Sequence, residues 1–176
     1  MKKSVLYFKD HRILLFSTKM GAGTFSQIYI QVVFAVHGRA SLIKPDWEEA
    51  LYKYISGIVT RKGQKILAIN GMPDHIHILI GMKPSCCLSD LVREIKKSSN
   101  AFISLHQYTT HPFAWQSGYG AFSYSQSSLD SVITYIRNQK KHHKTKPFKQ
   151  EYKEFLNKFN IEHKDDYLFE WIEENP

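Results

Sequence analysis

The chain has 176 residues, which suits one domain with a sizeable core and is too short for two. With 24 Lys and Arg against 16 Asp and Glu, its formal net charge is +8, which favours a polyanionic partner. No apolar run is long enough to span a bilayer, and its two cysteines, Cys86 and Cys87, are adjacent. A membrane span, a disulfide framework and a zinc site of spaced cysteine pairs are thereby excluded. We expect a soluble protein of a reducing cytoplasm.

The first half of the chain predicts alternating strands and helices. Residues 25–36 are rich in β-branched residues and predict a largely buried strand. Apolar residues recur at helical spacing over 45–63, which predicts a helix opened by Pro45. A second strand at 65–70 turns into a third at 71–81, and a second helix is expected over 88–106.

The second half predicts one more strand and two helices. The strand, at 113–125, is broken by the Gly118-Tyr119-Gly120 step, and the helices span 127–143 and the segment after Pro147. The order β, α, β, β, α, β predicts an α+β fold with a ferredoxin-like (RRM-like) antiparallel sheet. We expect helices on one face of this sheet, plus a further C-terminal helix and a tail.

The third strand carries the first candidate site. Its sequence, GMPDHIHILIG, places His75 and His77 on one face and the isoleucines between them and beyond on the other. Neutral imidazole is a common ligand of divalent cations, so this pair predicts a metal site. The alternative is a pair of ordinary histidines on the polar face of a half-buried sheet.

The helix at 127–143 carries the second candidate site. At about 100° per residue, Tyr135, Gln139 and His142 share a ridge beside the apolar stripe. This arrangement suits a tyrosine nucleophile one turn from an amide that serves as a third metal ligand. In the alternative, Tyr135 packs on the sheet and Gln139 faces water.

Together, the two motifs carry a family resemblance. A His-hydrophobic-His strand followed by a Tyr-x-x-x-Gln helix in a small basic protein resembles the single-tyrosine HUH transposases of the insertion sequence 200/605 group. The segments FAWQSGYGAFSYS at 113–125 and YIRNQKKHHK at 135–144 extend the resemblance, which covers nearly the whole chain from Met20. Residues 1–19 depart from it. We expect them to be an N-terminal extension or disordered tail, with 20–176 a single HUH transposase domain.

The resemblance implies a mechanism. His75, His77 and Gln139 would hold Mg²⁺ or Mn²⁺, and Tyr135 would cleave and rejoin single-stranded DNA through a 5′-phosphotyrosine intermediate. It also implies a DNA hairpin near an element end as the partner, and a homodimer with active sites shared between subunits. Basic residues expected along the DNA backbone are Arg93, Lys96, Lys97, Arg137, Lys140, Lys141, His142 and His143.

Other functions stay open at this point. A domesticated relative that cleaves chromosomal repeats shares all of this chemistry and differs in its flanking genomic DNA. A non-catalytic single-stranded nucleic-acid-binding module would bind without regard to metal or Tyr135. A zinc hydrolase would hold stoichiometric zinc and act without Tyr135.

Overall fold

The computed structural model describes residues 25–143, 146–164 and 168. The expected extension at 1–19 and the end of the expected tail, 169–176, lie outside these residues. The elements are β1 (Ile28–Ala35), η1 (His37–Arg39), α1 (Glu48–Arg61), β2 (Lys65–Met72), β3 (His75–Met82), α2 (Leu88–Leu105), β4 (Gly120–Tyr124), η2 (Gln126–Ser128), α3 (Leu129–Arg137), α4 (Gln139–His142) and α5 (Phe148–Lys158).

The four strands form one antiparallel sheet in the order β2-β3-β1-β4. This order places the first and third strands at the centre, as in a ferredoxin-like sheet, and confirms the predicted fold class. The predicted break in the last strand is confirmed as well. Trp115 makes an isolated bridge with Val36, Gly118 has a φ of +77°, and regular pairing begins only at Gly120.

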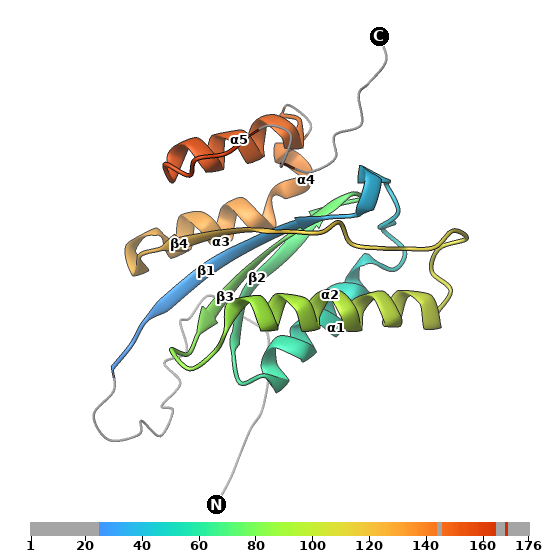
Figure 1. Ribbon diagram of the computed structural model, residues 1–176, viewed down its shortest axis with the longest axis horizontal. Coiled ribbons are helices and arrows are strands. Elements are labelled where there is room, and N and C mark those ends of the chain that lie inside the picture. Colours follow the sequence, from blue (N-terminus) through green and yellow to red (C-terminus); the bar gives the residue numbers. More distant parts are fainter. Residues whose placement is uncertain (1–24, 144–145, 165–167, 169–176) are drawn as a thin grey trace, which may run out of the picture.

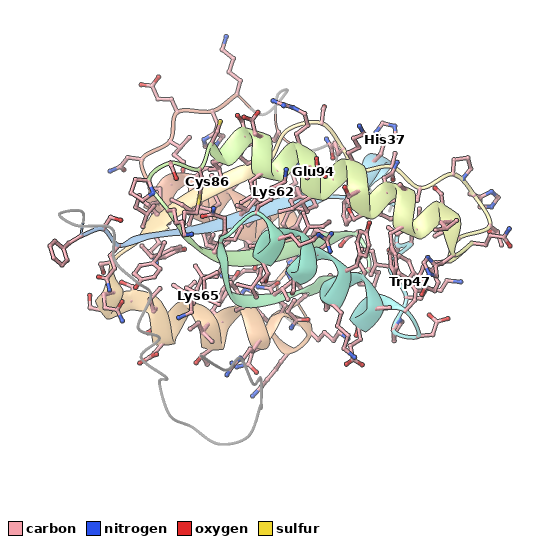
Figure 2. The ribbon with its side chains drawn as sticks, turned by 90° about the horizontal axis from the view of Figure 1, so that it is seen from below. His37, Trp47, Lys62, Lys65, Cys86 and Glu94 are labelled. Carbon is pink, nitrogen blue, oxygen red and sulfur yellow. The ribbon has the colours of Figure 1, made fainter. Side chains whose placement is uncertain are left out.

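The two faces of the sheet carry different helices, as Figure 1 shows: α1 and α2 lie on one side, and α3, α4 and α5 on the other. Side chains alternate along β1, so Val32 and Phe34 join the core under α1 and α2, whereas Val33 and Ala35 face α5. Figure 2 shows α1 and α2 side by side, with Trp47 at the N-terminal end of α1. None of the helices among the described residues is both long and apolar enough to cross a membrane.

The structure corrects two predicted helix boundaries. The helix expected over 45–63 begins at Glu48, because the residues after Pro45 form a turn. The helix expected over 127–143 is not continuous, since α3 ends at Arg137 and α4 begins at Gln139. The side-chain amide of Asn70 on β2 donates to the carbonyl oxygens of Ile136 (3.0 Å) and Arg137 (2.9 Å). These bonds satisfy the last carbonyls of α3 and fix where it ends against the sheet.

Candidate active site

His75 and His77 lie side by side on β3, on the face covered by α3, α4 and α5. Both side chains are buried, with exposed fractions of 1% and 0%, and their ring centroids are 5.2 Å apart. Sheet register places His77 between Asn70 of β2 and Val33 of β1, and Val33 is paired in turn with Gly120 of β4. The imidazole of His77 therefore lies in the middle of the sheet. It is directly across from Asn70, whose side-chain amide caps the end of α3.

A carboxylate from α5 lies among these imidazoles. Glu151 is 2% exposed, and its Oε2 lies 3.4 Å from Nε2 of His77, 3.9 Å from Nε2 of His75 and 3.2 Å from Nε2 of His143. The potential ligand atoms of these four residues all lie within 4.8 Å of one another. We call His75, His77, His143 and Glu151 the histidine–glutamate cluster. Its donor set suits a divalent metal ion.

Two of the cluster's rings are held by oxygen acceptors on their outer side. Nδ1 of His75 is 2.7 Å from the Asp74 carboxylate, and Nδ1 of His143 is 2.8 Å from the carbonyl oxygen of Lys146. Each Nδ1 thus carries the proton, and each Nε2 turns a lone pair inward. This is the usual arrangement of metal-binding histidines.

Burial keeps these two rings neutral. It lowers the pKa of His75 to about 3, against the opposing effect of the hydrogen bond to Asp74. Burial also lowers the pKa of His143 to about 4, against the hydrogen bond to Lys146. The neutral imidazole is the form that binds a metal.

Two buried atoms of the cluster also point to a cation. Nε2 of His77 and Oε2 of Glu151 have no hydrogen-bond partner among the described residues. On its other side, Nδ1 of His77 lies 2.9 Å from the side-chain amide of Gln31, and Nε2 carries a lone pair for a metal when that amide presents its oxygen to Nδ1. Buried polar atoms are costly without partners, so a coordinated metal suits both of them.

The second oxygen of Glu151 meets the predicted tyrosine ridge. The Tyr135 hydroxyl donates to Oε1, Nε2 of Gln139 donates to the same oxygen over 3.1 Å, and Nε2 of His142 lies 3.6 Å from it. The three residues expected to share a ridge thus meet at one point, beside both strand histidines and within one chain. A cavity of about 290 Å³ reaches Tyr135 and Glu151 and is edged by Lys146 and Lys158.

Gln139 is fully buried, and its amide nitrogen donates to Glu151. Its amide oxygen has no hydrogen-bond partner among the described residues, so its role as a metal ligand stays a prediction. A carboxylate and a third imidazole also stand beside the strand histidines. Sequence reasoning did not identify Glu151. The sequence of α5 contained one signal. Glu151 adjoins the apolar stripe of Phe148, Tyr152 and Phe155, where burying a carboxylate costs free energy of folding unless a partner compensates its charge.

The predicted DNA-binding residues are scattered. Arg93 is exposed and pairs with Asp90, Lys97 is exposed, and the Lys96 amine is bound by the backbone of 116–118.

On the other side of the sheet, Lys140 pairs with Glu48, and Arg137 and Lys141 are exposed. His142 and His143 lie against Glu151 rather than at the surface end of the helix. A DNA-binding role for the exposed members stays a prediction.

The described residues thus combine a ferredoxin-like sheet with a buried His-x-His strand that lies beside the helix of Tyr135. The family model described as "Transposase IS200 like" matches residues 24–139, more than half of the chain. The chain therefore belongs to the IS200-like transposase family.

Individual relatives agree with this assignment. The chain is 23% identical to the ISDra2 transposase TnpA of Deinococcus radiodurans over 132 residues, which cover 72% of this chain and 94% of that protein. The crystal structure of a candidate transposase from Deinococcus radiodurans R1 superposes with a TM-score of 0.55 at 24% identity, covering 69% of this chain and 98% of the other. The REP-associated tyrosine transposase bound to a REP hairpin gives a TM-score of 0.53 at 16% identity, over 70% and 74%. These two structures establish the shared fold.

Proposed function

We propose that this protein cleaves and rejoins single-stranded DNA through a covalent 5′-phosphotyrosine intermediate on Tyr135, with Mg²⁺ or Mn²⁺ at the strand histidines. The observation that carries this function is the meeting of the Tyr135 hydroxyl with the cluster of His75 and His77 through Glu151. A tyrosine nucleophile next to a candidate metal site is the arrangement that metal-assisted transesterification at phosphorus needs, which supports the proposal.

In this reaction, the Tyr135 oxygen loses its proton and bonds to phosphorus, the bond from phosphorus to the 3′ oxygen breaks, and the 3′ oxygen takes up a proton and leaves as a hydroxyl. The bound ion would offset the negative charge that develops on the phosphate oxygens. Because the phosphotyrosine link retains the energy of the phosphodiester bond, a second 3′-hydroxyl can reverse the step without ATP. The same active site can therefore both cleave DNA and rejoin its ends.

The substrate is DNA with a single-stranded cleavage site next to a hairpin. A solved relative with this fold is described as bound to a REP hairpin, and the formal charge of +8 at pH 7 favours a nucleic acid. Lys158 at the edge of the cavity beside Tyr135 is suited to receive the phosphate backbone. One chain by itself already brings Tyr135 to the strand histidines. The predicted homodimer with active sites shared between subunits remains an expectation.

A covalent-adduct assay tests this function. The protein is incubated with labelled hairpin DNA carrying a single-stranded 5′ flank and Mn²⁺, and products are separated on a denaturing gel. We expect wild type to form a protein–DNA adduct and a free 3′-hydroxyl fragment. Tyr135→Phe should form no adduct while still shifting the hairpin on a native gel, and His75→Ala should lose the metal-dependent cleavage.

The control is Tyr108→Phe, which changes a tyrosine that stacks on Trp47 on the opposite side of the sheet. It should form the adduct as wild type does. Cleavage that persists in Tyr135→Phe would contradict the proposed mechanism and favour a hydrolase. Cleavage that needs no divalent ion would contradict the proposed metal dependence.

A further inference from the structure

Building on the metal-dependent function proposed above, we propose that Glu151 is the anionic ligand of the metal and, through its second oxygen, the partner that holds the nucleophile Tyr135. His143 completes the ligand set with His75 and His77. Gln139, expected from the sequence to bind the ion, also positions Glu151 through its amide nitrogen.

Charge is the first reason. Two histidines and a glutamine form a neutral set, which is a weak site for Mg²⁺ or Mn²⁺ because both ions favour oxygen ligands. Glu151 adds the missing negative charge at the point where the imidazoles converge. A site of three imidazoles and one carboxylate can bind the metal ion without an additional negative charge from a DNA phosphate.

The second reason is the burial of Glu151 itself. A carboxylate with an exposed fraction of 2% is costly unless a cation or several donors compensate it. Among the described residues, the basic groups within 4.0 Å of its oxygens are all imidazoles. A divalent metal ion supplies the compensating charge.

The third reason is the direction of the lone pairs. Nε2 of His75 and Nε2 of His143 face each other at 3.2 Å, while both rings are held by acceptors at Nδ1. Oε2 of Glu151 lies 3.2 Å from the second of these nitrogens. Lone pairs that converge at this range repel one another unless a cation lies between them, so the arrangement is that of a chelating site.

The two oxygens of Glu151 have separate partners. Oε1 accepts hydrogen bonds from Tyr135 and Gln139, which leaves Oε2 directed at the imidazoles. One rigid carboxylate therefore links the metal to the phenol and fixes the distance between them. Gln139, on the short helix α4, stabilises this orientation through its amide nitrogen.

Manganese titration tests the assignment. The full chain is stripped with a chelator, dialysed and titrated with Mn²⁺ by isothermal calorimetry, with free Mn²⁺ followed by electron paramagnetic resonance. We expect Glu151→Gln to weaken Mn²⁺ binding by about tenfold or more. The visible spectrum of the Co²⁺-substituted protein should change in the same variant, because one ligand has been replaced.

The matched control is Glu154→Gln, the same chemical change one turn along α5, where the carboxylate is exposed and pairs with Lys146. Its Mn²⁺ affinity should stay within about threefold of wild type. Circular dichroism and thermal melting without metal show whether Glu151→Gln folds. Should it not fold, His143→Gln replaces it, with the same expected loss of affinity.

Wild-type Mn²⁺ affinity and an unchanged Co²⁺ spectrum in folded Glu151→Gln or His143→Gln would overturn the ligand assignment. The metal titration contains no DNA, so its result is independent of cleavage. Tyr135→Phe should abolish the DNA adduct and keep Mn²⁺ affinity, which separates failure of the ligand assignment from failure of the proposed function.

Discussion

At the scale of single residues, burial changes the role of Lys96. Its amine donates to the carbonyl oxygens of Gln116 (2.8 Å) and Gly118 and lies 5.1 Å from the centroid of the Phe34 ring. It thus ties the irregular segment before β4 to α2. Burial lowers the pKa of Lys96 from 10.5 to about 8.

This lowered pKa gives a pH-dependent stability. Below about pH 8, Lys96 is charged in the folded and unfolded chain, and the folded state bears the cost of desolvation. Between about pH 8 and 10.5, the folded lysine loses its proton while the unfolded one keeps it, so stability rises. We expect the free energy of unfolding of wild type to rise relative to Lys96→Met over this range, as measured by urea denaturation at a series of pH values. A difference that is flat or falls with pH would contradict this.

At the scale of elements, the hairpin of β2 and β3 sets the position of the histidines. Gly71 pairs with Ile76, next to His75, and a Cβ added at Gly71 would lie 2.2 Å from the carbonyl oxygen of His75 and 2.8 Å from the Cα of Ile76. Both of these are backbone atoms, which cannot rotate away. The close approach of the two strands therefore depends on glycine at this position.

We expect Gly71→Ala to lower the free energy of unfolding by about 1–3 kcal/mol and to shift the histidine strand. The matched control is Gly81→Ala at the other end of the hairpin, where the added Cβ meets only ordinary contacts, the nearest at 3.5 Å from Lys65. This variant should stay within about 1 kcal/mol of wild type. Urea denaturation measures both. Equal stabilities of the two variants would show that the strands separate more easily than this packing implies.

At the scale of the whole molecule, the two faces of the sheet separate stability from chemistry. His77 and Ile78 are neighbours in β3 and are both fully buried. Ile78 packs in the core with α1 and α2, whereas His77 faces α3, α4 and α5. Substitutions one residue apart should therefore have different consequences.

We expect Ile78→Val to cost about 0.5–1.5 kcal/mol of stability and to leave Mn²⁺ affinity unchanged. His77→Ala should weaken Mn²⁺ binding by about tenfold or more. Urea denaturation and calorimetric titration of the same preparations give the two quantities. A loss of Mn²⁺ affinity in folded Ile78→Val would mean that the two faces are coupled.

The local sequence determined the strand that carries His75 and His77, the two helices that cover the opposite face, and the ridge of Tyr135, Gln139 and His142. These features follow from periodicity, which acts between neighbours in the chain. The α+β class followed from the order of the elements, because few topologies accommodate that order.

Only the tertiary structure decided that α5 covers the same face as α3 and brings Glu151 to the strand histidines (Figure 1). It also decided that α3 ends at Arg137, through an amide that Asn70 supplies from another element. Glu151 is 74 residues from His77 along the chain, counted from 77 to 151, so local periodicity carries no information on their contact. Long-range packing sets where a helix docks, and with it which charge enters the site.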